Sequence, residues 1–531
     1  MVMECMSIPI RRFGILSICI LCLLTLATMV ETGEAAEDWP TFRHGNDRTG
    51  VTSEKGPEDP NIRWIFETEG YVYSSPSYHD GRIYVGSNDS FAYCLDASTS
   101  KEIWKFETGG TIQGSITIAQ GYAYVPSYDN SLYCLDAITG KFIWSFPTQG
   151  DIFSTPVVSA DYVIFGSGDG NVYCVNWETG EEEWTFSAGG FVWGSPAVDG
   201  MRVFVGAGSN MYCLTLNTGF PVWATPLGEM IIASPAVYDG EVYIGTTGNN
   251  LPHYLYCLNA DTGLINWQFA NPDGGGFFSS AAVTESMVFV GSDSRKLYAV
   301  SRDSGDLRWE FETGGAISSS PAVNDRYVYF GSADGFIYCL DRPFGYRMWE
   351  VETPDVVYSS PCVVDGMLWV GCWDGNVYCI GPWARDLPGG QDFTYLKIWE
   401  PNGKNDTADA NFTIKIIAII THYNATISYY YSNQLNSTEA TPIAVNLSIF
   451  EVRGIYDWDT SDIPGGKYFI KAVLVNGNTT LTDWSEEPVT IEHPKEESDD
   501  DFIPGPSVIM VIISLVVMGV FRRVLFKPRL E

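Results

Sequence analysis

LYCLDAITGKFIW (residues 132–144) returns as VYCVNWETGEEEW (residues 172–184) and again as YCLNADTGLINW (residues 256–267). The first two copies begin 40 residues apart, since 172 − 132 = 40. Self-similarity at a fixed period of this length is typical of repeat folds, in which each unit buries its apolar face against the next one. The repeat therefore decides the fold.

The tryptophan that ends each unit marks the repeat along the chain. Successive markers lie 40, 40, 40, 39, 44, 42 and 40 residues apart. They are Trp64, Trp104, Trp144, Trp184, Trp223, Trp267, Trp309 and Trp349. A second series, of one small residue per unit, runs Cys94, Cys134, Cys174, Cys213, Cys257, Ala299, Cys339 and Cys379. Eight members in each series predict eight units.

One period contains four short β-runs separated by turn signals. In the unit that begins at Ile317 these are SSSPAV, RYVYFGS, FIYCL and YRMWEV. Four strands in about 40 residues make one blade of a propeller. The sequence thus predicts an all-β chain with an eight-bladed β-propeller over residues 37–383. We expect the marker tryptophans to pack blade against blade, and pairs such as Thr139-Gly140 to be turns in which glycine supplies a positive φ.

The phase of the repeat predicts how the ring closes. Trp64 lies on a fourth-strand motif that no first three strands precede, whereas the last unit, residues 357–380, has three strands only. The strand around residues 63–66 should therefore complete that last blade. Closure of this kind removes the two exposed edges of an open array.

Composition excludes one class of function and favours one class of fold. The chain has 30 Lys and Arg against 65 Asp and Glu, a net charge of −35, which excludes gripping nucleic acid through bulk charge. It is 45% apolar and 18% charged, unlike a disordered chain. Its 53 glycines and 14% aromatic residues favour short strands and tight turns over a helical bundle.

The 12 cysteines invite a disulfide framework, but the repeat argues against one. Equivalent positions in neighbouring blades lie about 10 Å apart, and a disulfide needs Cα atoms within about 7 Å. Cys362, Cys372 and Cys379 share one blade, yet its hairpin turns place no two of them opposite each other. We interpret the repeated cysteines as small buried hydrophobes.

Both ends of the chain carry membrane-targeting patterns. Arg11 and Arg12 precede an apolar run over residues 13–30, which predicts a signal peptide over residues 1–36, with an uncleaved anchor as the alternative. A second apolar run predicts a transmembrane helix as the C-terminal anchor, residues 504–523. The basic tail, residues 524–531, should stay cytoplasmic, which makes the chain a single-pass protein with its ectodomain at the cell surface.

The region between the propeller and the anchor has a different character. A linker, residues 384–392, precedes residues 393–493, where runs such as FTIKIIAII (412–420), ATISYYYS (425–432) and KYFIKAVLV (467–475) predict a β-sandwich. An acidic spacer, residues 494–503, follows. Six of the seven glycosylation sequons of the chain lie in this region. The seven are Asn88, Asn405, Asn411, Asn424, Asn436, Asn446 and Asn478.

The repeat resembles the pyrroloquinoline-quinone-type propeller family, whose signature looks like Y-x-x-D-x-x-T-G-x-x-x-W. The resemblance covers residues 39–383 and includes a lead-in segment, Trp39-Pro40-x-Phe42-Arg43. Eight-bladed members include quinone-dependent alcohol dehydrogenases and non-enzymatic scaffolds such as the propeller lipoprotein of the bacterial barrel-assembly machinery. The resemblance implies the fold and leaves the function open.

Two further resemblances concern the rest of the chain. Residues 456–468, YDWDTSDIPGGKY, resemble immunoglobulin-like and fibronectin type III modules of prokaryotic surface proteins, which implies a stalk. The Pro-Gly segment, the apolar run and the basic end resemble the C-terminal sorting tails of archaeal surface proteins.

Any chemistry should lie where the units differ, in the loops that enter the innermost strands beside the channel. Two positions before the aligned Ser or Thr, these loops carry Tyr73, Gln113, Phe153, Trp193, Ile232, Phe278, Ser318 and Tyr358. Five of the eight are aromatic. One interpretation is that the rings plug the channel or pack on neighbouring loops. The other is an apolar funnel for a peptide or a sugar face, with Asp151 and Glu229 at its rim.

The same loops argue against a quinone enzyme, because none contains Lys or Arg and pyrroloquinoline quinone carries three carboxylates. The only basic pair in the adjacent turns between second and third strands is Arg295-Lys296. The resemblance also implies a vicinal disulfide and a calcium cluster in the enzymes, and this chain has no adjacent cysteines. No metal or catalytic motif is evident.

We therefore expect a non-catalytic scaffold that binds an extracellular protein or polysaccharide. A dehydrogenase using pyrroloquinoline quinone and calcium is the first alternative, and a polysaccharide-binding surface protein the second.

Overall fold

The computed structural model describes residues 38–248 and 252–382, and beyond these nine strands between residues 395 and 491, with residues 440, 463 and 464. The predicted signal peptide, linker, acidic spacer, anchor and basic tail lie outside the described residues. Every regular element in the described part is a strand. No helix there is long and apolar enough to cross a membrane.

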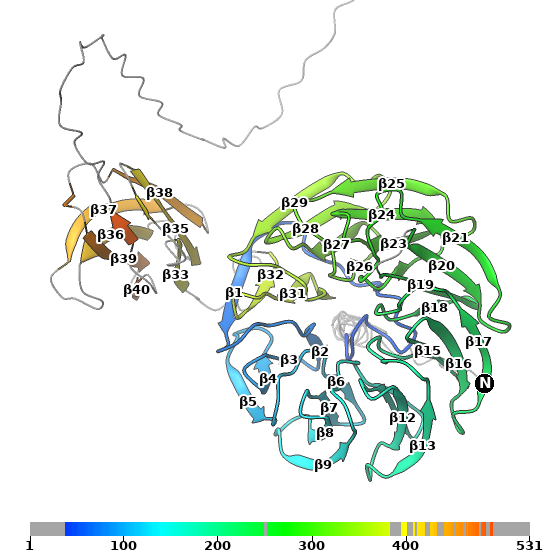
Figure 1. Ribbon diagram of the computed structural model, residues 1–531. Coiled ribbons are helices and arrows are strands. Elements are labelled where there is room, and N and C mark those ends of the chain that lie inside the picture. The colour runs from blue at the N-terminus through cyan, green and yellow to red at the C-terminus, as the bar shows by residue number, and fades with distance from the viewer. Residues whose placement is uncertain are drawn as a thin grey trace, which may run out of the picture.

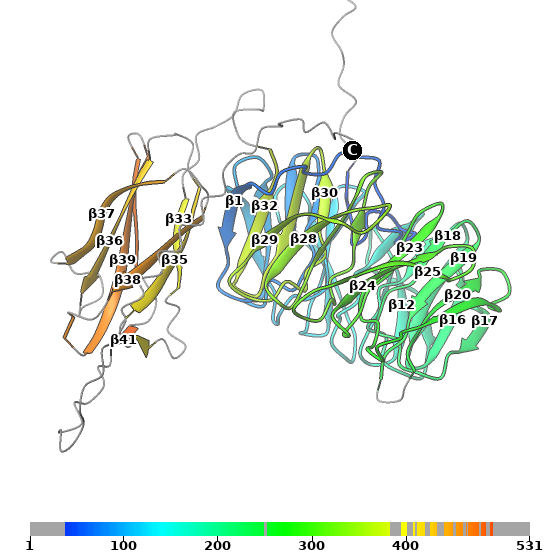
Figure 2. The same ribbon diagram turned by 90° about the horizontal axis from the view of Figure 1, so that it is seen from above.

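Eight four-stranded antiparallel sheets stand around a central axis as a β-propeller (Figure 1). Seen from the side, their strands run across the thickness of the ring (Figure 2). The innermost strands are β2 (Ser77–His79), β6 (Thr117–Ala119), β10 (Val157–Ser159), β14 (Ala197–Asp199), β18 (Ala236–Tyr238), β22 (Ala282–Val283), β26 (Ala322–Val323) and β30 (Cys362–Val364). The blades that they begin are numbered 1 to 8 in this order.

The next three strands of each blade follow outward. The second strands are β3 (Arg82–Gly86), β7 (Tyr122–Pro126), β11 (Tyr162–Gly166), β15 (Arg202–Ala207), β19 (Glu241–Gly245), β23 (Met287–Gly291), β27 (Tyr327–Gly331) and β31 (Met367–Gly371). The third strands are β4 (Phe91–Asp96), β8 (Ser131–Asp136), β12 (Asn171–Asn176), β16 (Asn210–Thr215), β20 (Tyr254–Asn259), β24 (Lys296–Ser301), β28 (Phe336–Asp341) and β32 (Asn376–Ile380). The outermost are β5 (Glu102–Glu107), β9 (Phe142–Pro147), β13 (Glu182–Ser187), β17 (Pro221–Pro226), β21 (Ile265–Ala270), β25 (Leu307–Glu312), β29 (Arg347–Glu352) and β1 (Ile62–Glu67).

The ring closes as the phase of the repeat predicts. Strand β1 pairs antiparallel with β32, with Trp64 opposite Cys379, so the first strand of the propeller completes the last blade. The four runs predicted for the unit beginning at Ile317 correspond to strands β26 to β29. Both predictions are confirmed.

Burial explains the composition of the strands. Second strands such as β11 are buried along most of their length, because a neighbouring blade covers each face of the sheet, and they are continuously apolar. Outermost strands such as β13, EEWTFS, are mostly exposed apart from the buried tryptophan, as expected of a sheet edge that meets solvent.

Each marker tryptophan lies on the outermost strand, and seven of the eight donate to a carbonyl of the next blade. The eighth, Trp349, donates to the Pro57 carbonyl of the segment that precedes β1. The Trp144 indole N–H donates to the Trp177 carbonyl at 3.2 Å, and the Trp184 indole N–H donates to the Leu216 carbonyl at 2.8 Å. The turn glycine of the next blade lies beneath the ring: a Cβ on Gly180 would stand 2.6 Å from the Trp144 ring. Gly140 and Gly180 have φ of 68° and 71°, which confirms the predicted positive φ in these turns.

The nine cysteines in the described part of the chain are buried free thiols, as the interpretation of them as small hydrophobes predicts. Cys94 and Cys134 lie opposite Trp104 and Trp144 on the adjacent strand of their own blades. Burial raises the pKa of each of these two thiols to about 12.

The remaining strands form two further sheets. One has the order β33 (Tyr395–Glu400), β35 (Asn411–Ile419), β38 (Arg453–Asp459). The other joins β34 (Thr407–Ala408), β41 (Val489–Ile491), β39 (Gly466–Asn476), β36 (Ala425–Ser432) and β37 (Thr441–Ile449), with β40 (Thr479–Trp484) paired to β39. The three predicted strand runs are confirmed as β35, β36 and β39.

One face of the second sheet is buried. Ile427 lies opposite Leu474 and Tyr429 lies opposite Ala472, and all four side chains are buried. Of the predicted glycosylation sites, Asn88, Asn411 and Asn446 belong to the described residues, and the other four lie outside them.

Candidate functional site

The lead-in segment, residues 38–57, closes one side of the channel (Figure 1, dark blue). Its backbone follows the inside of the ring and accepts hydrogen bonds from successive innermost strands. The donor and acceptor pairs are Ile118 N–H to Pro40 O at 2.7 Å, Val198 to Asn46 at 2.7 Å, Val237 to Asp47 at 2.8 Å, Val283 to Thr49 at 3.0 Å and Val323 to Gly50 at 2.9 Å. The channel is therefore a blind recess that opens on the opposite face.

Two buried arginines fix this segment. Arg48 is 0% exposed and donates to the carbonyls of Thr155, Pro156 and Pro196 at 3.2, 3.0 and 3.1 Å. Arg43 donates to the Pro321 carbonyl at 2.7 Å and to the Ala281 carbonyl. Both guanidinium groups are thus engaged by backbone carbonyls of the blades and do not face the open mouth.

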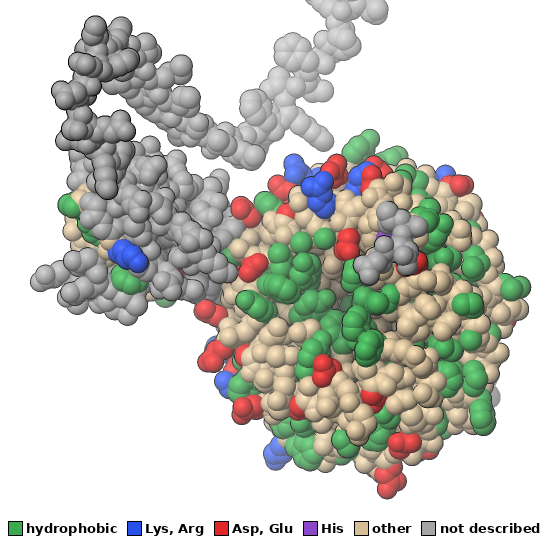
Figure 3. Space-filling view, in the orientation of Figure 1, with side chains coloured by type: hydrophobic (Ala, Val, Ile, Leu, Met, Phe, Trp, Pro, Cys, Tyr) green, Lys and Arg blue, Asp and Glu red, His purple; other side chains and the backbone are tan. Residues whose placement is uncertain are grey.

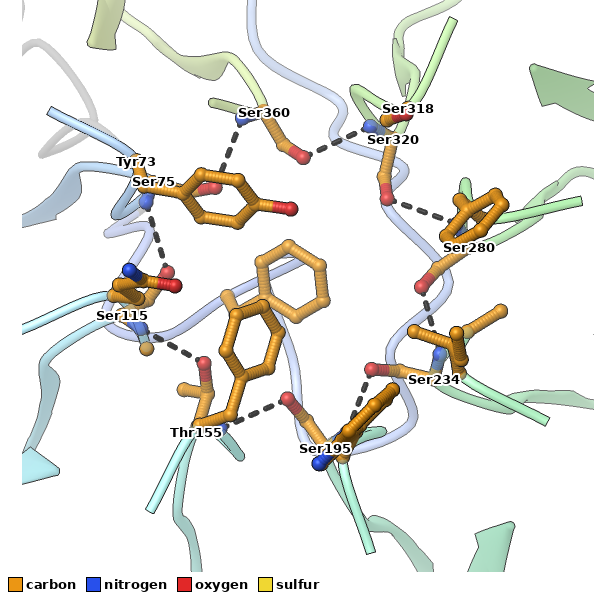
Figure 4. Close-up of a pocket in the computed structure, with 18 of the residues that line it drawn as sticks. Tyr73, Ser75, Ser115, Thr155, Ser195, Ser234, Ser280, Ser318, Ser320 and Ser360 are labelled. Atoms are coloured by element: carbon orange, nitrogen blue, oxygen red, sulfur yellow. Dashed lines mark hydrogen bonds between the residues drawn. The ribbon is translucent and has the colours of Figure 1, made fainter. Parts of the chain in front are cut away.

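A closed ring of eight hydroxyl groups surrounds the axis above the lead-in segment (Figure 4). In each blade the backbone N–H of the ring residue donates to the side-chain oxygen of the ring residue in the next blade, over 2.8 to 3.1 Å. The members are Ser75, Ser115, Thr155, Ser195, Ser234, Ser280, Ser320 and Ser360. These are the Ser and Thr positions on which the loops align in the sequence, so the sequence shows that a hydroxyl recurs in every unit. The hydrogen bond from each blade to the next is seen only in the structure.

The structure brings all eight predicted loop positions together. Tyr73, Gln113, Phe153, Trp193, Ile232, Phe278, Ser318 and Tyr358 line one narrow pocket with the hydroxyl ring and Phe42 of the lead-in segment. Its volume of about 80 Å³ leaves room for a few water molecules, since one water occupies about 30 Å³. We call this narrow pocket the neck, and it forms the closed end of the channel.

A wider recess of about 460 Å³ opens above the neck. Ten residues line it: Tyr73, Tyr128, Gly150, Asp151, Phe153, Gly168, Phe191, Trp193, Ile232 and Phe278. Six are aromatic and one is a carboxylate. Figure 3 shows hydrophobic side chains gathered around the axis on this face, with a few acidic side chains beside them and more at the outer rim. Of the two acidic residues predicted at the rim, Asp151 lines the recess and Glu229 is not among these ten.

One wall of the recess is a packed aromatic cluster. The Tyr73 ring lies 5.6 Å from that of Phe153 and 6.0 Å from that of Tyr358. The Tyr128 hydroxyl donates to Gln113 Oε1 at 2.9 Å. Burial, with Tyr358 nearby, raises the pKa of Tyr73 to about 12, farther above physiological pH than that of an ordinary tyrosine. On this wall the rings contact one another, as the packing interpretation describes.

The wall formed by the loop that enters blade 4 presents its rings to solvent. Phe191 and Trp193 are 60% and 37% exposed, and their rings are stacked with centroids 5.6 Å apart and planes 12° apart. Exposed stacked rings at the mouth of a recess are available to a ligand. Phe191 and Tyr128 were missed in the sequence, although Phe191 lies two residues before Trp193 in the same loop.

The residues present do not fit pyrroloquinoline quinone. None of the ten described residues around the recess is basic, and three carboxylates need cationic partners there. Arg43 and Arg48 are engaged elsewhere. Lys296, of the one basic pair in the adjacent turns, forms ion pairs with Asp273 at 2.9 Å and Glu310 at 2.8 Å. In the described residues no group of three or more His, Cys, Asp or Glu could hold a metal ion.

Comparison with known proteins agrees with the fold. A family model described as outer membrane protein assembly factor BamB matches residues 56–185, 168–381 and 252–434, more than half of the chain in total. This confirms the resemblance to the propeller repeat. No curated protein matches the chain.

Solved structures similar to this chain have different functions. BamB from Moraxella catarrhalis is 18% identical, with a TM-score of 0.53, over 61% of this chain and 100% of that one. Quinohemoprotein alcohol dehydrogenase from Comamonas testosteroni is 16% identical, with a TM-score of 0.57, over 67% and 82%. The computationally designed Ika8 protein is 15% identical, with a TM-score of 0.53, over 61% and 100%. At these identities the likeness concerns the fold alone.

Proposed function

This chain belongs to the family described as outer membrane protein assembly factor BamB, and from that premise we propose that it is a non-catalytic propeller scaffold that binds a partner protein at its aromatic recess. One observation carries the proposal. The channel is closed on one face by the lead-in segment, and on the other it opens into a recess where Phe191 and Trp193 present their stacked rings to solvent.

The titratable groups of the recess support binding over catalysis. Asp151 is the one carboxylate among the described lining residues, whereas hydrolysis of a glycosidic bond ordinarily uses two. Burial raises the pKa of Tyr73 to about 12, so its hydroxyl is a still weaker acid than that of an ordinary tyrosine, which is already protonated at physiological pH. Such a set can position a ligand and offers no paired acid and base.

The rest of the chain suits a role at the cell surface. We infer that residues 1–36 direct export, that residues 393–493 form a glycosylated immunoglobulin-like sandwich acting as a stalk, and that residues 504–523 anchor the protein as a membrane helix of archaeal type. The acidic spacer would hold the stalk off the membrane and the basic tail would remain in the cytoplasm. The partner would then be extracellular.

Capture of surface proteins tests the proposal. Trp193→Ala should lose the partner in a cross-linking pull-down and keep the wild-type melting temperature, because Trp193 is partly exposed. Phe220→Ala is the matched control, since Phe220 is 70% exposed on the outside of blade 4, and should retain the partner. Equal capture by wild type and Trp193→Ala would reject the recess as the binding site.

The exposed, stacked rings of Phe191 and Trp193 favour polysaccharide binding as the second candidate function. The flat face of a sugar stacks on aromatic rings such as those of Phe191 and Trp193, with Asp151 positioned to accept hydrogen bonds from hydroxyl groups. A glycan array would then give a signal with the wild type that Trp193→Ala loses.

A further inference from the structure

The recess combines aromatic rings and a carboxylate with no positive charge. Asp151 enters it from the loop before β10, held by a hydrogen bond from the Gly168 N–H to the Asp151 carbonyl at 2.8 Å. Its side chain is exposed. None of the ion pairs in the described part of the chain uses this carboxylate. The negative charge of Asp151 is therefore available to a ligand.

The rings add to the same electrostatic preference. The face of an aromatic ring carries negative potential and attracts a cation within about 6 Å. Tyr128, Phe153, Phe191 and Trp193 line the recess together with Asp151. Burial, with the charge of Asp151 nearby, raises the pKa of Tyr128, so this tyrosine loses its proton even less readily than an ordinary one, which is neutral at physiological pH. The chain as a whole has a charge of −35, which draws cations toward it over long range.

The polar groups are too few for a ligand that depends on many hydrogen bonds. The Tyr128 hydroxyl already donates to Gln113, so the polar side-chain groups that remain are the carboxylate of Asp151, the hydroxyl of Tyr73 and the indole N–H of Trp193. A guanidinium group fits this set better than any other side chain, because it stacks on aromatic faces and pairs with a carboxylate. A volume of about 460 Å³ exceeds one arginine side chain and admits the adjoining backbone as well.

We propose that the recess binds an arginine side chain from an extended segment of the partner protein, with the guanidinium paired to Asp151 and stacked on the aromatic rings. This proposal rests on the proposed function, since it names the chemistry that the same site recognises. It goes beyond that function in making recognition depend on charge.

Calorimetric titration of the full-length protein in mild detergent tests it. The probes are the peptide acetyl-Gly-Gly-Arg-Gly-Gly-amide and its citrulline counterpart, which keeps the shape of arginine and removes the charge. We expect saturable binding of the arginine peptide and at least about tenfold weaker binding of the citrulline peptide. Asp151→Asn should weaken the arginine peptide by about tenfold and abolish the discrimination.

Asp161→Asn is the matched control, because Asp161 is an exposed carboxylate in the turn that follows β10 in the same blade, and it should leave binding unchanged. Equal affinity for the two peptides, or an Asp151→Asn protein that binds like wild type, would overturn the proposal. So would the absence of binding up to about 10 mM peptide.

The two proposals fail in different ways. If Trp193→Ala loses the partner in the pull-down while the peptides are not distinguished, the recess is a partner site that does not read charge, and only the arginine inference fails. If Trp193→Ala retains the partner, the proposed function fails, whatever the peptides show.

Discussion

Each hydroxyl of the axial ring accepts one backbone N–H from the preceding blade, so one atom per blade ties eight sheets together. The N–H of Thr155 has the Ser195 oxygen as its acceptor at 2.9 Å, and both residues are buried. A buried N–H that loses its acceptor incurs the desolvation cost of that group in full, about 1–3 kcal/mol. The hydroxyl ring thus stabilises the propeller through polar contacts between neighbouring blades beside the central axis.

Ser195→Ala should lower the free energy of unfolding of the propeller by about 1–3 kcal/mol, seen as a lower transition temperature in scanning calorimetry. Thr155→Ser is the control, since it keeps the hydroxyl and removes one methyl group, and should have a smaller effect. If Ser195→Ala has the same transition temperature as the wild type, the hydroxyl ring does not contribute to the stability of the propeller.

The repeated cysteines give a second expectation for single residues. Because burial raises the pKa of Cys94 and Cys134 to about 12, the thiolate fraction at pH 8 is far below that of a free cysteine. Iodoacetamide should leave both unmodified in the folded protein and modify both in guanidinium, as read by peptide mass spectrometry. Stoichiometric labelling of the folded protein at pH 8 would contradict their burial.

At the scale of the element, the contact between a tryptophan and the next turn explains why the repeat keeps both Trp and Gly. Gly180 needs a positive φ, and it also leaves space for the Trp144 ring. Gly200, in a hairpin turn of blade 4, has a φ of 57°, but a Cβ added there would meet nothing within 4 Å. A comparison of substitutions at Gly200 and Gly180 therefore distinguishes the cost of backbone strain, present at both, from the cost of a clash with the neighbouring blade, present only at Gly180.

Gly200→Ala should destabilise the propeller by about 1–2 kcal/mol, the strain of a left-handed conformation alone. Gly180→Ala should exceed it by about 1–3 kcal/mol, because the added methyl overlaps the Trp144 ring. Chemical denaturation of the two variants side by side gives the difference. If they are equally destabilised, the glycine is kept for its φ and the tryptophan contact is secondary.

The elements themselves could be predicted from the sequence because each carries its own periodic signal. Trp64 without preceding strands, and residues 357–380 without a fourth strand, were enough to predict the pairing of β1 with β32. The site was predictable in part: the loop alignment named Trp193 and Asp151. The alignment missed Tyr128, because it covers only the loops that enter the innermost strands. Tyr128 lies in the turn between β7 and β8, the second and third strands of blade 2.

At the scale of the whole molecule, the lead-in segment changes what the channel is. Arg43 and Arg48 occur once and have no period, so no repeat signal marks them, and their partners in the blades are carbonyls more than 100 residues away along the chain. Only the folded ring brings those carbonyls to one place. The segment turns an open pore into a recess with one mouth, and a ligand of the channel must then enter from that face.

The charge of the whole molecule leads to the last prediction. Pyrroloquinoline quinone should show no saturable binding to the full-length protein in calorimetric titration, with or without calcium. Its three carboxylates would meet Asp151 and a ring-lined recess with no basic residue among those described, in a chain of net charge −35, and a buried anion without a cationic partner is unfavourable. A quinone-dependent alcohol dehydrogenase titrated under the same conditions is the positive control. Saturable, calcium-dependent binding would contradict the scaffold proposal and direct the search to alcohol oxidation.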